Sequence, residues 1–213
     1  MATRRKVSNL LALAVLGTLV QRPMHPYEIA SLLRERGKDE DMEIKWGSLY
    51  TVVRNLAKHG FVEVAGSRRE GARPERTIYR ITDAGLAELR DWTRELVATP
   101  QPEHPRFKAG LSMLPALPPD EVVTALRERV TSLEQSIAAQ RESRAGHADV
   151  PTLFLIEDEY ELTIRAAELA WVRGLLEELT NETFPGLAAW RNWHATGEVP
   201  PEYAELADRG STE

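Results

Sequence analysis

The chain has 213 residues, of which 42% are hydrophobic and 28% charged, which excludes a wholly disordered chain and leaves material for a folded core. It has no cysteine, which excludes disulfides, thiolate metal sites and cysteine nucleophiles. The net charge is −6, but the charges are unevenly distributed along the chain. Residues 1–97 carry 17 Lys and Arg against 13 Asp and Glu, whereas residues 98–213 carry 10 Lys and Arg against 20 Asp and Glu. This difference indicates two modules with different partners.

The first predicted helix covers residues 9–20 and follows the basic cluster Arg4-Arg5-Lys6. A basic cluster before an apolar run is also typical of secretory signal peptides. This run ends without a small-residue cleavage site, and it is shorter than the roughly 20 apolar residues that span a bilayer. We therefore predict a buried helix in a cytoplasmic protein that does not bind a membrane.

Two further helices are predicted over residues 26–36 and 47–59. Pro26 suits the first turn of a helix, where its missing N–H costs nothing, and Gly37 and Gly60 follow the two helix ends. Together with the preceding helix they are typical of a helix-turn-helix domain. Their apolar residues recur at helical spacing: Ile29, Leu32 and Leu33 in the first, and Leu49, Val52, Val53 and Leu56 in the second.

The pattern then changes to that of two strands, over residues 61–64 and 77–81, with a loop rich in glycine and arginine between them. Thr82 is the expected N-cap of a fourth helix over 83–97. Three helices, a hairpin and a helix are the order of a winged helix-turn-helix. We predict this DNA-binding domain over residues 1–97.

Three prolines mark a linker over residues 99–105, and the chain beyond it is predicted to be helical. We predict a helical dimerisation domain over residues 106–182 and a partly disordered C-terminal extension over 183–213, with a short helix around Trp190 and Trp193. The predicted fold class is therefore mainly α with a small β-hairpin. The helices of the second domain are expected over residues 106–114, 119–144 and 151–182.

Two of these helices have apolar residues in coiled-coil spacing. The last helix is apolar over a wider surface than one seam needs. Besides its heptad leucines, this surface includes Ile156, Tyr160, Ile164, Ala167 and Trp171. We infer two buried faces, one against the same chain and one against a second subunit. The predicted dimerisation residues are Leu126, Val130, Leu133, Ile137, Leu155, Leu162, Leu169 and Leu176.

The outward face of the helix over 47–59 and the arginine-rich loop are the predicted DNA-binding elements. A recognition helix reads bases in the major groove, and hydroxyl, guanidinium and ammonium groups are suitable donors for base edges and phosphates. The alternatives are a solvated loop and, for Tyr50, partial burial; Arg80 on the strand can point elsewhere. The predicted DNA-binding residues are Ser48, Tyr50, Thr51, Arg54, Lys58, Arg68, Arg69, Arg73 and Arg76.

Other chemistry is sparse in the sequence. The five histidines have no ligand spacing, Glu157-Asp158-Glu159 points to different sides of a helix, and no phosphate-binding or nucleophile motif is present. We predict no catalytic residue, no metal and no cofactor. Trp92 is a candidate for lining a small-molecule pocket, although aromatic residues at helical spacing are more often core residues.

Over residues 9–92 the sequence resembles the PadR family of bacterial transcriptional regulators. Its C-terminal half is similar, more loosely, to the helical domain of the longer members, the virulence-activator type. There are two departures: Pro26 stands where the family often has glycine, and Glu75 lies in a wing that is usually more basic. The resemblance lies in Pro23-Met24-His25-Pro26-Tyr27-Glu28-Ile29, in Gly47-Ser48-Leu49-Tyr50 with Leu56 and Gly60, and in Tyr79-Arg80-Ile81-Thr82 with Gly85 and Leu89.

The resemblance implies a homodimer that binds double-stranded DNA at an inverted repeat in a promoter, usually as a repressor. In some members a phenolic or multidrug-like ligand releases the DNA, so a small aromatic or lipophilic effector is a further expected partner. Two alternatives are a winged helix that binds only proteins and an enzyme that uses the winged helix only to dimerise. The enzyme would need a glycine-rich loop after a strand, which residues 98–213 lack.

Overall fold

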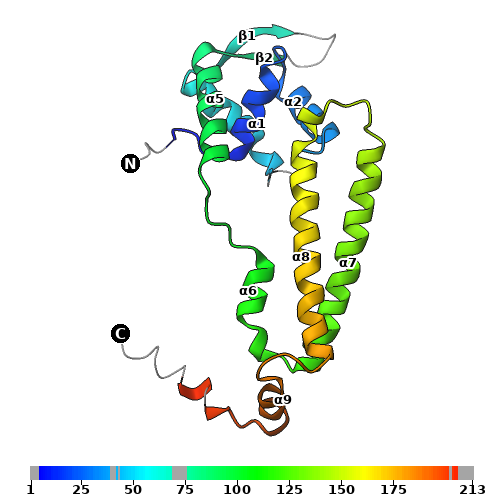
Figure 1. Ribbon diagram of the computed structural model, residues 1–213. Helices are drawn as coiled ribbons and strands as arrows, with labels where there is room; N and C mark the ends of the chain where they lie inside the picture. Colours follow the sequence, from blue (N-terminus) through cyan, green and yellow to red (C-terminus); the bar gives the residue numbers. More distant parts are fainter. Residues whose placement is uncertain (1–4, 39–41, 43, 69–75, 202, 206–213) are drawn as a thin grey trace. The chain divides into compact units, whose positions relative to one another are not determined.

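The structure, a computed structural model, divides into two compact units, residues 1–102 and 103–213. The division falls within the predicted linker over 99–105. The fold class is confirmed: the described chain is mainly helical with one two-stranded hairpin (Figure 1). The structure describes residues 5–38, 42, 44–68, 76–201 and 203–205.

The first unit is a winged helix-turn-helix. Its helices and strands are α1 (Leu10–Leu19), α2 (Pro26–Glu35), the 3-10 turn η1 (Trp46–Ser48), α4 (Leu49–Lys58), β1 (Val62–Arg68), β2 (Arg76–Ile81) and α5 (Asp83–Ala98).

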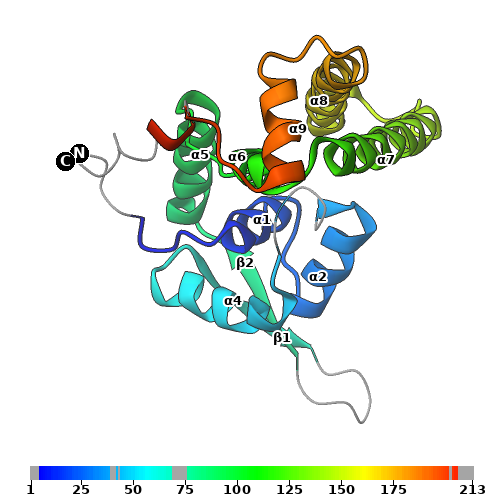
Figure 2. The same ribbon diagram turned by 90° about the horizontal axis from the view of Figure 1, so that it is seen from below.

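Helix α1 forms the centre of this unit. Its residues Leu11, Val15 and Leu16 are fully buried, and the helix contacts α2, α4 and α5 (Figure 2). The apolar run near the N-terminus is therefore a core helix, as predicted. Burial of several large side chains at about 25 cal/mol per Å² of apolar surface makes this helix a main source of the unit's stability.

The wing is attached to the helices at two points. The backbone groups of Met24, in the turn before α2, exchange two hydrogen bonds of 3.0 Å with Tyr79 of β2. At the start of α5, the Thr82 hydroxyl accepts from the N–H of Gly85 (3.0 Å) and donates to the carbonyl of Gly60 (2.6 Å). Thr82 is thus the N-cap, as predicted. A Cβ on Gly85 would lie 1.9 Å from the Phe61 carbonyl oxygen, so only glycine fits there.

The second unit is built on two long antiparallel helices, α7 and α8, which lie side by side (Figure 1). Ion pairs flank their contact: Arg129 with Glu168, and Arg144 with Glu159 at 3.1 Å. The predicted helix over 151–182 is instead a short 3-10 turn followed by a longer helix. The helices and turns are α6 (Arg106–Ser112), η2 (Leu114–Ala116), α7 (Pro119–Ala145), η3 (Thr152–Phe154), α8 (Ile156–Thr180) and α9 (Leu187–Thr196).

Helix α9 belongs to the core of the second unit. Leu187 and Trp190 are buried against α7 and α8, and the indole N–H of Trp190 donates to the carbonyl of Leu117 (3.1 Å). The sequence-based limit of the helical domain at residue 182 therefore leaves out part of the packed core. The end of the predicted extension, residues 206–213, lies outside the described residues.

Among the residues that the structure describes, no helix is long and apolar enough to cross a bilayer.

Candidate nucleic-acid interface

Helix α4 has one buried and one exposed face. Leu49, Val52, Val53 and Leu56 are buried in the core of the first unit, which fixes the rotation of the helix. The opposite face is exposed, and it consists of Tyr50, Thr51, Arg54, Asn55 and Lys58. The helical period of the sequence predicts this division, and it holds at each of these positions.

Three polar residues on this face have unoccupied donors. Within the part of the chain that the structure describes, Thr51, Arg54 and Lys58 have no side-chain hydrogen bond or ion pair. A donor without an internal hydrogen bond can bind a ligand at a lower cost in free energy, because no existing bond has to break first. The exposed face of α4 is therefore a surface of available hydroxyl, guanidinium and ammonium groups.

Two of the predicted residues at the start of α4 have other contacts. Ser48 is half-buried and its hydroxyl donates to the carbonyl of Lys45 (2.7 Å), so the donor is used in the turn before the helix. The ring of Tyr50 is 55% exposed and lies edge-on to the ring of His25, 6.3 Å between centroids. Tyr50 is therefore exposed, with His25 as an aromatic neighbour.

The described part of the wing places its arginines differently. Arg80 pairs with Glu63 across the strands (2.7 Å), so this arginine is engaged within the wing. Arg76 is half-buried at the start of β2, and its backbone is opposite that of Arg68 in the strand register. Arg69 and Arg73, and Glu75 with them, lie outside the described residues.

Strand pairing in the wing is longer and less regular than predicted. β1 extends over seven residues, and the register shifts by one residue between Val64 and Gly66. Such a bulge bends a strand and increases its twist. Because the glycine gives no hydrophobic alternation, the sequence pattern ends the strand too early, at residue 64.

Comparison with known proteins agrees with this architecture. A model of the PadR-like transcriptional regulator family matches residues 15–91. Residues 15–91 belong to the PadR-like family. Its members are DNA-binding transcriptional regulators and not enzymes, which confirms the expectation that this chain is no enzyme and leaves the protein-interaction alternative without support.

Solved structures of PadR-like regulators share the fold of this family member. Bacillus subtilis PadR in complex with operator DNA superposes with a TM-score of 0.68 at 19% identity, covering 80% of this chain and 99% of that one. The same protein in complex with p-coumaric acid gives 0.65 at 18% identity, with 81% and 99% covered. The Vibrio cholerae virulence activator AphA gives 0.61 at 20% identity, with 81% and 99% covered. No curated protein matches the chain.

The first unit of this PadR-like regulator has an apolar hollow that the sequence did not reveal. Its volume is about 240 Å³, and small residues of α1, including Gly17, leave the space open. Trp92, the predicted pocket residue, is 4% exposed in the core and does not line this hollow. The lining residues are Leu13, Ala14, Gly17, Thr18, Leu33, Arg36, Lys38, Met42 and Leu89.

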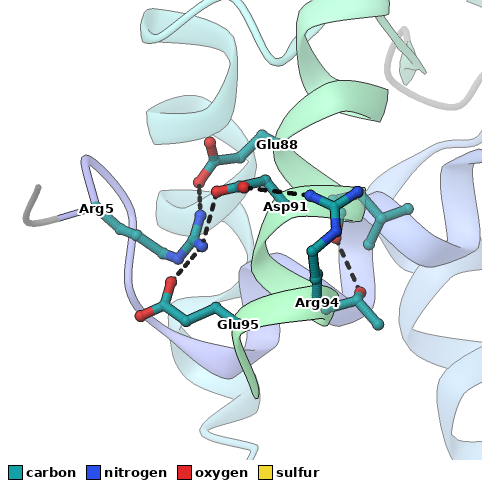
Figure 3. A network of polar contacts seen from close by, with 7 residues as sticks. Arg5, Glu88, Asp91, Arg94 and Glu95 are labelled. Carbon is teal, nitrogen blue, oxygen red and sulfur yellow. Dashed lines mark hydrogen bonds and ion pairs between the residues drawn. The ribbon is translucent and has the colours of Figure 1, made fainter. Parts of the chain in front are cut away.

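Trp92 lies beneath an arginine from the N-terminal segment. The guanidinium carbon of Arg5 is 5.5 Å from the centre of the Trp92 ring. The same guanidinium binds Glu88 (2.8 Å), Asp91 (3.0 Å) and Glu95 on α5 (Figure 3). Burial lowers the pKa of Arg5, but the hydrogen bonds to these carboxylates outweigh burial and raise it above its ordinary value. This contact fixes the chain before α1 to α5.

Replacing Arg5 with alanine should lower the free energy of unfolding by about 1–2 kcal/mol. The Arg5 side chain is only 12% exposed, and its loss leaves Glu88 and Glu95 without this cation, while Asp91 keeps only the exposed Arg94. Urea unfolding of the full chain measures the change. Arg94→Ala is the matched control, because Arg94 is 72% exposed and Asp91 is its one ion-pair partner among the described residues, so we expect less than about 0.5 kcal/mol. Equal midpoints for both variants would contradict a stabilising role for Arg5.

The second unit has an apolar surface that its own chain leaves exposed. Ile156, Tyr160, Ile164 and Trp171 lie on one side of α8 and are each about half-exposed or more, with Tyr160 at 67%. We call these four residues the α8 face. By contrast, Leu126 and Ile137 of the predicted dimerisation set are buried within the chain, and the other six members are half-buried. The heptad positions of α7 and α8 therefore face the interior of the unit.

Proposed function

We propose that this family member is a homodimeric repressor that binds an inverted-repeat site in promoter DNA through α4 and the wing. The observation that carries the proposal is the exposed face of α4, where Thr51, Arg54 and Lys58 present donors that have no partner among the described residues, while the opposite face is held in the core. A rigidly seated helix with such a face suits the major groove. The solved complex of Bacillus subtilis PadR with operator DNA supports the assignment by analogy of fold.

The DNA contacts divide into two kinds in this proposal. Tyr50, Thr51 and Arg54, near the N-terminal end of α4, read base edges, while Lys58 and the wing arginines bind phosphates. Ser48 supports the turn before the helix and offers its oxygen only as an acceptor. The wing arginines of this set are Arg68, Arg69, Arg73 and Arg76.

The dimer forms, in this proposal, through the helical unit. The predicted seam residues Leu126, Val130, Leu133, Ile137, Leu155, Leu162, Leu169 and Leu176 stabilise the α7–α8 pair, and the α8 face supplies the contact with the second subunit. Four large apolar side chains on one helix face are costly to leave in water, and a second copy of the same face covers them. A twofold dimer then matches an inverted repeat.

Repression follows from the position of the site, because a dimer on promoter DNA excludes other proteins from it. Access to chromosomal DNA requires that the protein act in the cytoplasm. A small aromatic or lipophilic acid is the proposed effector, since the hollow in the first unit has apolar walls with Arg36 and Lys38 in its lining. The solved complex of Bacillus subtilis PadR with p-coumaric acid supports this class of ligand.

A mobility-shift assay on the DNA upstream of the protein's own gene, with a salt titration, tests the proposal. The proposal assigns five basic residues per subunit, Lys58 and the four wing arginines, to phosphates, so log K should fall against log salt with a slope of about −4.5 or steeper. A scrambled DNA of equal length is the control and should bind at least about 100-fold more weakly. Equal affinity for both DNAs, or binding insensitive to salt, would contradict the proposed function.

A further inference from the structure

His25 lies at the junction of the turn before α2, the recognition helix and the wing. Its ring nitrogen Nδ1 accepts a hydrogen bond from the backbone N–H of Tyr27 (3.1 Å), and its own backbone N–H donates to the Glu28 carboxylate (2.8 Å). The two bonds form a capping box at the start of α2. Histidine is an unusual residue for this role, which serine, threonine, aspartate and asparagine fill most often.

The same residue contacts α4 and directly follows the residue that anchors the wing. The ring lies edge-on to Tyr50 of α4, with an angle of 68° between the ring planes. Its neighbour Met24 is fully buried and pairs with Tyr79 of β2, so the wing is anchored one residue away. His25 therefore joins the start of α2 to α4 at the place where the wing is held.

We propose that His25 in its neutral form is a positioning residue for the DNA interface, and that protonation of its ring weakens DNA binding. This inference rests on the proposed function of the first unit as a DNA-binding domain. It adds His25 to the residues proposed on α4 and the wing, and it makes the affinity for DNA depend on pH.

The chemistry of the cap explains the pH dependence. Because Nδ1 accepts a hydrogen bond, the neutral ring holds its proton on Nε2, and a second proton can be added only at Nδ1. A protonated Nδ1 cannot accept from Tyr27, so the cap of α2 is lost and the ring is released from its place beside Tyr50. The cost is a helix cap, typically about 1 kcal/mol, together with the positioning of α4.

The charged groups around the ring favour the neutral form in the folded state. Burial lowers the pKa of His25 below its ordinary value, and Arg76 of β2 lowers it further, while Glu28 opposes both. Arg22, which pairs with Glu28 at 3.5 Å, partly offsets that carboxylate. The cap therefore contributes stability above the ordinary histidine pKa near 6.5, and this contribution is lost as the pH falls through the lowered folded value.

The test compares promoter affinity at pH 7.5 and pH 5.5, at constant ionic strength, for the full-length protein and two variants. His25→Asn keeps a capping oxygen and cannot titrate, whereas His59→Asn removes a histidine at the end of α4 that does not cap a helix N-terminus. From pH 7.5 to pH 5.5 the affinity of each protein falls by some factor. We expect this factor to be at least five times larger for the parent and for His59→Asn than for His25→Asn. At pH 7.5 we expect His25→Asn to keep specific promoter binding, with a lower affinity than the parent because the ring contact with Tyr50 is lost.

Parallel pH profiles for the parent and His25→Asn would overturn the inference while leaving the proposed function intact. An affinity that rises at pH 5.5 in the parent but not in His25→Asn would overturn it too, because the ring would then act as a cationic phosphate contact. Absence of specific binding by the parent at pH 7.5 would instead contradict the proposed function, and the inference with it.

Discussion

Replacing Arg54 with alanine should reduce affinity for the promoter site by about 30-fold or more, with no change in thermal stability. The side chain is exposed on α4 and has no partner within the described chain, so its removal costs nothing in the folded protein. A dimer loses two such contacts, and a bidentate contact from arginine to a base is worth about 1–3 kcal/mol each. Binding at fixed salt and circular dichroism melting measure the two effects.

The charge-matched control for this variant is Arg90→Ala. Arg90 is exposed on α5 and lies outside the proposed interface, so its removal should change affinity by less than about threefold. Tyr50→Ala should also weaken binding, because it removes an exposed hydroxyl and the ring against His25. If Arg54→Ala and Tyr50→Ala both bound the promoter like the parent, the assignment of α4 as the recognition helix would be wrong.

If the proposed dimer forms through the α8 face, replacing Ile164 with glutamate should yield a monomer and lower promoter affinity by at least about 100-fold. Ile164 lies in the middle of the α8 face and is 49% exposed in the single chain, so the change leaves the core of the unit intact. In a dimer the two copies of the new carboxylate would be buried near each other, which costs several kcal/mol. Sedimentation at micromolar concentration measures the oligomeric state.

The matched control is Ala166→Glu, an exposed position on another side of α8. It adds the same charge to the same helix and should leave both the dimer and DNA binding unchanged. If Ile164→Glu remained a dimer, the α8 face would not be the subunit contact, and the heptad leucines of α7 and α8 would have to be reconsidered for that role. Far-UV circular dichroism of both variants checks that each is folded.

Most elements of the fold can be predicted from the sequence because several independent signals agree. For α4 the helical period, the glycine after its end and the polar outward residues all indicate one rotation of the helix, and that rotation is found. For α5 the capping threonine marks the start, which the Thr82–Gly85 hydrogen bond confirms. Such local signals do not depend on tertiary structure.

The remaining features depend on contacts between distant residues. The heptad leucines show that α7 and α8 have apolar seams, but periodicity alone does not say whether a seam faces the same chain or another one. The Arg5 contacts join residues more than 80 positions apart, and nothing in the pattern of either segment indicates them. The same is true of Trp92, whose helical spacing fits a pocket wall and a core residue equally well.

The central claim is that a dimer places two copies of α4 in successive major grooves of one promoter site. Hydroxyl-radical footprinting of the full-length protein on the DNA upstream of its own gene tests this claim most directly. We predict two protected segments on the same face of the duplex, with centres about 10 base pairs apart. A single protected segment, or protection spread evenly along the DNA, would contradict it.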